Sequence, residues 1–136
     1  MVSPTVSGSC LCGAVKFSIT GNFESFFLCH CSRCRKDTGS AFAAKLFSSN
    51  ASIAWLAGQD HIKTFCVPAS RHEKSFCTTC GSALPSVQMS GGLLVVPAGS
   101  LEGPIKIRPH ARICYASRAA WTDDLDTLPR LDGLPS

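Results

Sequence analysis

The chain has 136 residues, of which 45% are hydrophobic and 16% are charged, so a disordered polymer is excluded and one folded domain is expected. Its formal net charge is +4, yet aromatic residues make up only 8% and no basic stripe interleaved with aromatic residues is present, so we expect no nucleic-acid partner. No apolar run approaches the roughly 20 residues that a membrane-spanning helix needs, so we expect no membrane partner.

Short strands are predicted along most of the chain. In the first of them Val15, Phe17 and Ile19 alternate with polar residues, which is the period of two expected for a half-buried strand. Further runs rich in β-branched or aromatic residues predict strands at 24–28, 41–47, 52–56, 61–67, 93–96 and 105–115. Only 32–38 and 116–121 could form helical turns. The sequence therefore predicts a mostly β fold, a small domain of stacked antiparallel sheets.

The domain organisation is expected to be simple. We predict one domain over residues 1–136, with a core at about 7–121 and a surface tail at 122–136. The tail carries four of the nine acidic residues together with Pro129 and Pro135. The amino end shows neither a basic patch nor an apolar stretch ahead of Cys10, so we expect a cytoplasmic protein.

Cysteine is the residue type that stands out, with nine copies. An odd number of cysteines in a reducing compartment favours metal ligands over disulfides. Cys66 and Cys114 are isolated in strand-like runs, and we expect them to be packed core cysteines. The other seven fall into three tight groups: Cys10 with Cys12; Cys29 with Cys31 and Cys34; and Cys77 with Cys80.

The spacing inside these groups is typical of metal sites. In an extended segment side chains two positions apart leave on the same face, so each Cys-x-Cys pair directs two sulfurs to one point. The group at Cys77 and Cys80 is a Cys-x-x-Cys turn followed by Gly81, and glycine permits the backbone conformation that wraps a metal. This turn is the most specific single signal in the sequence.

Seven sulfurs do not divide into fours, so we predict two unequal zinc sites and two zinc ions per chain. Cys10, Cys12, Cys77 and Cys80 would form a closed structural site that staples a zinc-ribbon-like core. Cys29, Cys31 and Cys34 would hold a catalytic zinc with an open fourth position. The alternatives are free buried cysteines, or one zinc site with three spare thiols that pack as small apolar groups. Seven thiolates and two zinc ions would also lower the formal net charge by three.

The segment around the middle group carries other candidate residues. Arg33, Arg35 and Lys36 are predicted to attract an anionic substrate, the alternative being a solvated turn. His30 lies between two predicted ligands but would point to the opposite face, so it is not predicted as a ligand. An acid–base role is open to it, although a surface or hydrogen-bonded histidine is the more frequent outcome. His61, His72 and His110 have no ligand-type neighbours at metal spacing.

The ordered cysteine groups resemble a known family. The stretches Gly8–Phe17, Cys29–Lys36 and Phe76–Gly81 are similar to the glutathione-dependent formaldehyde-activating enzyme (GFA) family, which includes centromere protein V-like members. The resemblance extends from about Ser7 to Trp121. It implies a structural zinc on the first and third groups, a catalytic zinc on the middle group, and all seven ligand positions are intact. The activity it implies is condensation of glutathione with formaldehyde. The reverse reaction breaks the carbon–sulfur bond, which makes the enzyme a carbon–sulfur lyase.

The residues are compatible with that chemistry. Zinc with an open position can lower the pKa of a bound thiol and hold it beside a small carbonyl compound. Two other readings stay open: a zinc-stabilised binding module without catalysis, and a thiol reductase using Cys114. The second rests on a faint similarity of residues 112–117 to B-type methionine sulfoxide reductases, but it leaves the middle cysteine group unexplained.

Overall fold

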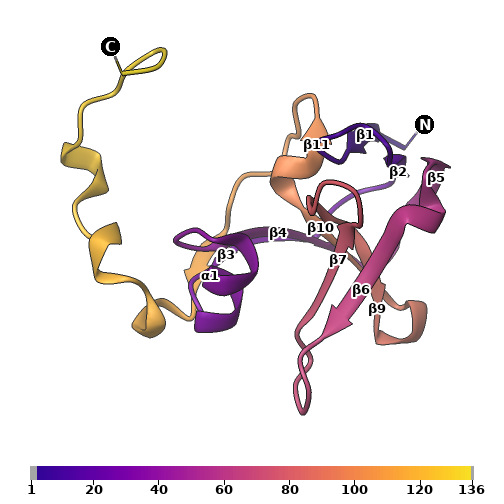
Figure 1. The fold of residues 1–136 in the computed structure, drawn as a ribbon, viewed down its shortest axis with the longest axis horizontal. Coiled ribbons are helices and arrows are strands. Elements are labelled where there is room, and N and C mark those ends of the chain that lie inside the picture. The colour runs from indigo at the N-terminus through magenta and orange to yellow at the C-terminus, as the bar shows by residue number, and fades with distance from the viewer. Residues whose placement is uncertain (1–2, 136) are drawn as a thin grey trace.

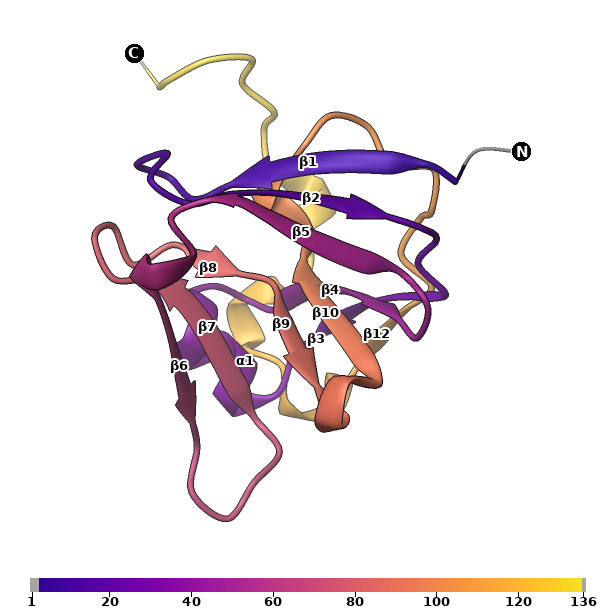
Figure 2. The ribbon, with the colours of Figure 1, turned by 90° about the vertical axis from the view of Figure 1, so that its right-hand side faces the viewer.

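The computed structural model describes residues 3–135 and arranges them as three β-sheets with a short helix, α1, at Ser32–Thr38 (Figure 1). The predicted class, a mostly β domain of stacked sheets, is confirmed. Figure 2 shows β1, β2 and β5 along one side of the molecule, with β10, β9 and the β6–β7 hairpin beside them.

The four-stranded sheet has the order β11-β1-β2-β5 and is antiparallel throughout. Its strands are β1 (Thr5–Ser9), β2 (Lys16–Thr20), β5 (Ser52–Ala57) and β11 (Leu101–Glu102). The alternation that predicted β2 has its expected cause, because Phe17 and Ile19 are fully buried whereas Lys16 is exposed. This sheet carries the turn that holds the first cysteine pair.

The five-stranded sheet has the order β12-β3-β4-β10-β9. It consists of β3 (Ser25–Cys29), β4 (Ala43–Ser48), β9 (Ser86–Gln88), β10 (Leu93–Pro97) and β12 (Ala111–Ile113), with β12 parallel to β3. One face, including Leu46 and Val96, belongs to the main core. The opposite face carries Cys29 and Ala43, which pack together under α1.

The three-stranded sheet, β6-β7-β8, is built on a hairpin. Its strands are β6 (Ile62–Cys66), β7 (Glu73–Cys77) and β8 (Ala83–Leu84). Cys77 ends β7 and is fully buried in the same core as Phe17 and Leu46. The main core therefore joins all three sheets. Single 3-10 turns lie between strands at η1 (Gln59–His61), η2 (Met89–Gly91) and η3 (Ala98–Ser100). Three more follow β12: η4 (Tyr115–Ser117), η5 (Ala120–Thr122) and η6 (Leu125–Thr127).

The strand predicted at 105–115 is wrong over most of its length, because only Ala111–Ile113 forms a strand. Residues 105–110 alternate apolar and polar residues like a strand, but prolines stand at 104 and 109 and the segment joins no ladder. Five strands were not predicted: β1, β7, β8, β9 and β11.

Beyond Thr122, the described residues of the tail are all exposed, and in Figure 1 this segment runs away from the sheets. Thr122 itself is buried and donates a hydrogen bond from its hydroxyl to the Ala119 carbonyl (2.7 Å). Among residues 3–135, no helix is long and apolar enough to cross a membrane.

Candidate metal centres

Four cysteines meet where the four-stranded and three-stranded sheets adjoin. Cys10 and Cys12 lie in the turn after β1, whereas Cys77 ends β7 and Cys80 lies in the turn that follows it. Their Sγ atoms all lie within 4.8 Å of one another, with Cys10 to Cys12 at 3.6 Å and Cys12 to Cys77 at 3.9 Å. The first and third groups of the sequence are therefore brought together, as the favoured pairing expected.

Each turn of this cluster is held by its own backbone hydrogen bonds. In the first, the Gly13 N–H donates to the Cys10 carbonyl (3.2 Å), and in the second the Gly81 N–H donates to the Cys77 carbonyl (2.7 Å). The two glycines have φ of +83° and +76°, the left-handed region that side chains resist. The Val15 N–H also points at the Cys10 Sγ (3.2 Å), so the backbone favours a thiolate there.

The middle group forms a second, separate cluster of three sulfurs. Cys29 ends β3, Cys31 caps the start of α1, and Cys34 lies in its first turn. Their Sγ atoms also lie within 4.8 Å of one another. Cys29 and Cys34 are buried and pack with Ala43, whereas Cys31 is partly exposed. Solvent therefore reaches this cluster on the side of Cys31.

In both clusters the thiols shift one another's pKa values. At Cys80, burial opposes ionisation, but backbone hydrogen bonds at Cys12 and Ser82 and the neighbouring thiols outweigh it and lower its pKa to about 6. At Cys12, a backbone hydrogen bond at Ala14 favours the thiolate, but burial and the neighbouring thiols raise the pKa to about 11. Each cluster thus concentrates negative charge on a subset of its sulfurs.

The three-sulfur cluster behaves in the same way. Burial raises the pKa of Cys29 and, more strongly, that of Cys34. At Cys31, burial is outweighed by hydrogen bonds from the backbone and from the other two thiols, and its pKa is lowered. The Cys34 N–H donates to the Cys31 Sγ at 3.3 Å. The partly exposed sulfur is therefore the one that ionises most easily.

Both donor sets fit zinc. A tetrahedral ion bound to thiolates at about 2.3 Å needs sulfurs about 3.8 Å apart. The two sulfur separations at Cys12, 3.6 and 3.9 Å, bracket that value. The four-sulfur cluster can complete a tetrahedron alone, whereas the three-sulfur cluster supplies three of four positions.

The three basic residues predicted beside the middle cluster all lie on α1. Arg33 and Lys36 are exposed, and Arg35 is partly buried with its Nε lacking a hydrogen-bond partner. Among the described residues, none of the three forms an ion pair with a carboxylate. Their positive charges are therefore free to act on an anion approaching the helix.

The His30 side chain is neither at the surface nor hydrogen-bonded to any described residue, which are the two outcomes that are more frequent for a histidine. It is fully buried, and neither ring nitrogen has a hydrogen-bond partner within residues 3–135. Its ring packs against those of Phe42 and Tyr115, with centroids 5.2 and 5.4 Å away. Burial, assisted by the charges of Arg112 and Arg118, lowers its pKa, so the imidazole is neutral.

The expectation for the two isolated cysteines is wrong. Cys66 and Cys114 are both exposed instead of packed in a core. Cys66 ends β6 next to the loop that connects the two strands of the hairpin, opposite Glu73. Cys114 follows β12 with a left-handed φ of 53°, which turns the chain outward into η4.

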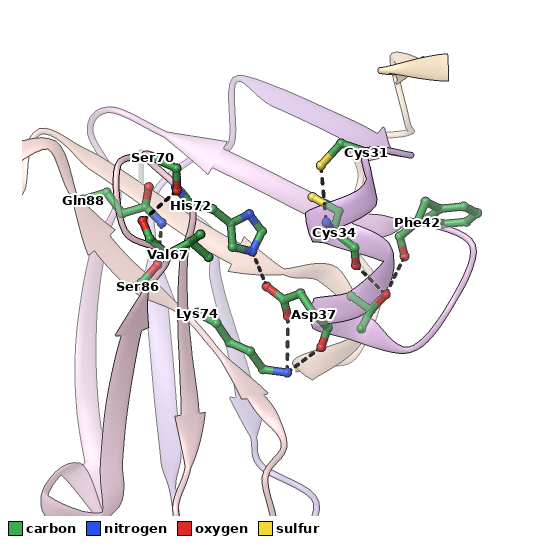
Figure 3. Close-up of polar contacts among 11 residues, drawn as sticks. Cys31, Cys34, Asp37, Phe42, Val67, Ser70, His72, Lys74, Ser86 and Gln88 are labelled. Carbon is green, nitrogen blue, oxygen red and sulfur yellow. Dashed lines mark hydrogen bonds and ion pairs between the residues drawn. The ribbon is translucent and has the colours of Figure 1, made fainter. Parts of the chain in front are cut away.

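A polar tie between β7 and α1 was not expected from the sequence. Asp37, only 10% exposed, accepts from His72 Nε2 at 2.7 Å and pairs with Lys74 Nζ at 3.3 Å (Figure 3). Lys74 also donates to the Asp37 carbonyl at 2.6 Å. Because Asp37 belongs to the same helix as Cys31 and Cys34, this tie fixes the helix that carries the three-sulfur cluster against the hairpin (Figure 3).

Comparison with known proteins gives concordant results. Residues 5–117 match the family described as glutathione-dependent formaldehyde-activating enzyme. A Halomonas elongata protein, provisionally named as a glutathione-dependent formaldehyde-activating enzyme, is 34% identical over 113 residues, which are 79% of this chain and 72% of that protein. A crystal structure of a Rhodobacter sphaeroides protein, 26% identical, aligns with a TM-score of 0.53 over 73% of this chain and 90% of that one. The matched region includes every residue of both cysteine clusters.

Proposed function

Because the chain belongs to the family of glutathione-dependent formaldehyde-activating enzymes, we propose that it is a zinc-dependent carbon–sulfur lyase. It would add glutathione, or a similar thiol, to formaldehyde or another small carbonyl compound. The observation that carries this proposal is the presence of two separate sulfur clusters of unequal size. A purely structural zinc protein needs only closed sites, and the second cluster is one ligand short of closure.

The two clusters would take different roles. Cys10, Cys12, Cys77 and Cys80 would hold a structural zinc, because they come from two sheets that the ion would join. Cys29, Cys31 and Cys34 would hold the catalytic zinc. Zinc bound there would supply a position for an incoming thiol and lower the pKa of that thiol.

The reaction balances without a further reactant. The thiol sulfur forms a bond with the carbonyl carbon, the electron pair of the C=O double bond moves to oxygen, and the proton lost by the thiol ends on that oxygen. The product is a hydroxymethyl thioether, and the reverse reaction breaks the carbon–sulfur bond. Because no oxidant or group donor takes part, the main task of the site is to bring the two reactants together.

The residues around the cluster would serve this task in distinct ways. Ala43 and Ile113 pack against the sulfurs and exclude water from their buried side. Neutral His30 packs against Phe42 and Tyr115 and would anchor the backbone that connects Cys29 to Cys31. Arg33, Arg35 and Lys36 would attract the carboxylates of glutathione to the helix.

The cellular setting is also part of the proposal. None of the nine cysteines is in a disulfide, a state that a reducing compartment maintains. We therefore place the protein in the cytoplasm, working on small molecules without a nucleic-acid or membrane partner.

The proposal is tested by counting zinc ions and by following formaldehyde with NMR in the presence of glutathione. The wild-type protein is expected to hold two zinc ions per chain and to accelerate formaldehyde consumption above the uncatalysed background. Cys31→Ser removes the most exposed ligand of the three-sulfur cluster, so it should lose one zinc ion and return the rate to background. Cys66→Ser, an exposed cysteine outside both clusters, is the matched control and should keep both properties.

The same measurements separate the competing readings. Two zinc ions without thiol-dependent turnover would indicate a binding module. A thiol reductase would lose its activity in Cys114→Ser and keep it in Cys31→Ser.

A further inference from the structure

Lys45 lies on the same sheet face as the three-sulfur cluster. In the β3–β4 ladder Cys29 is opposite Ala43, and Phe27 is opposite Lys45. Side chains two positions apart on a strand share a face, so Lys45 lies on the same face as Ala43 and is next to Phe27. The Phe27 and Phe47 rings lie 6.1 Å apart, as expected for side chains on one face.

The ammonium group of Lys45 has no carboxylate partner. Lys45 is partly buried, and no carboxylate among residues 3–135 lies within ion-pair distance of it. The neighbouring Lys74 differs, because its ammonium is bound by Asp37. A partly buried cation without a counter-ion is costly, and a bound anion would remove that cost.

A cavity of about 180 Å³ opens beside this lysine. Its wall includes Ala43, which packs directly against Cys29 and Cys34, so the cavity is adjacent to the sulfur cluster. Besides Lys45, its wall carries the paired Asp37 and Lys74, the acid Glu73, and neutral polar residues that include Ser86 and Gln88. Since Asp37 and Lys74 pair with each other, the charges left for a ligand anchored at the sulfurs are those of Lys45 and Glu73.

We propose that Lys45 binds a carboxylate of the thiol substrate, so that this cavity is the subsite for the polar arm of an amino-acid-derived thiol. The inference rests on the proposed function in that the substrate's sulfur would lie at the three-cysteine cluster. Glutathione has the required chemistry, because flexible arms connect its thiol to carboxylates and to an ammonium group. Lys45 then selects for thiols that carry a carboxylate.

Lys45 has a second neighbour that its positive charge could serve. The charge lowers the pKa of Cys34 to some degree, although burial dominates and the net shift is upward. A lysine that only balanced the sulfur cluster would affect every thiol substrate equally. A lysine that binds a carboxylate would affect only substrates that carry one, and this difference separates the two roles.

The test uses the zinc-loaded protein and S-methylglutathione, whose binding requires no carbon–sulfur bond formation. Titration into the ¹⁵N-labelled wild type, followed by NMR, should give saturable shifts, and Lys45→Met should weaken the affinity about tenfold, as expected for one charge-assisted contact. Lys45→Arg, which keeps the charge, should recover most of the affinity. Lys63→Met, an exposed lysine on β6, should bind like the wild type. The diethyl ester of S-methylglutathione should bind weakly to both the wild type and Lys45→Met.

Equal binding of S-methylglutathione by the wild type and Lys45→Met would overturn the proposal, as would the absence of binding by the wild type. The proposal would also be overturned if Lys45→Met lost as much affinity for the ester as for S-methylglutathione. Thiol-dependent formaldehyde consumption with a KM for glutathione unchanged in Lys45→Met would leave the proposed function intact and remove the subsite. Lys45-dependent binding of S-methylglutathione without formaldehyde turnover would leave the subsite intact and contradict the proposed function.

Discussion

At the scale of single residues, the four-sulfur cluster depends on where each cysteine lies on its strand. Cys66 and Cys77 belong to the same hairpin, at opposite ends of it: Cys66 lies opposite Glu73 and Cys77 lies opposite Ile62. Cys66 is exposed, whereas Cys77 is fully buried at the cluster. The two residues therefore form a matched pair for measuring what a ligand position contributes to stability.

We expect Cys77→Ser to lose one zinc ion and to lower Tm by about 10 °C or more, because metal-binding energy in a structural site is folding energy. Cys66→Ser should leave zinc content and Tm unchanged. Zinc analysis and thermal unfolding followed by circular dichroism measure both quantities. A Cys77→Ser protein that kept its zinc and its Tm would show that this cluster is not a structural metal site.

The sequence predicted how the cysteines group, but not the environment of single side chains. Grouping follows from local chain geometry, since two or three intervening residues keep two sulfurs near one point. Burial depends on what covers a strand from elsewhere in the fold. For that reason the expectation that Cys66 and Cys114 lie in the core was wrong, and the burial of His30 against two aromatic rings was not foreseen.

At the scale of elements, the residue pattern predicted strands such as β2, missed others such as β7, and extended the strand at 105–115 too far. β2 shows regular alternation because one face packs in the core and the other faces solvent. β7 carries Glu73 and Lys74 and so lacks an apolar run, although its hairpin partner and Cys77 hold it in place. Segment 105–110 has alternation without a partner strand, and pairing is decided by topology, which the pattern does not contain.

The tie between α1 and β7 is the element-scale contact that positions the three-sulfur cluster. Asp37→Asn removes the carboxylate charge and leaves the partly buried Lys74 unpaired. Because breaking a buried ion pair strands its partner, we expect a loss of about 2 kcal/mol in the free energy of unfolding. Urea denaturation measures this loss, and Asp132→Asn in the exposed tail is the control. Equal stability of the two variants would show that the tie does not hold the helix.

At the scale of the whole molecule, one core joins three sheets, and the proposed zinc sites lie at its margins. The four-sulfur cluster lies between the four-stranded and three-stranded sheets, and the three-sulfur cluster lies between the five-stranded sheet and α1. The division of labour proposed for the two sites follows from this placement. An ion between two sheets supports the fold, whereas an ion beside a helix with one partly exposed ligand is open to a reactant.

The tail is expected to contribute nothing to this framework, so the predicted domain boundary can be tested by shortening the chain. A protein that ends at Thr122 keeps the buried hydroxyl contact to Ala119 and loses the surface ion pair between Arg118 and Asp123. Exposed ion pairs contribute less than about 1 kcal/mol, so Tm should change by no more than about 2 to 4 °C, and the zinc content should stay at the value of the full chain. Thermal unfolding and zinc analysis of the two proteins measure this. A shortened protein that unfolds at a much lower temperature would place part of the tail inside the folding unit.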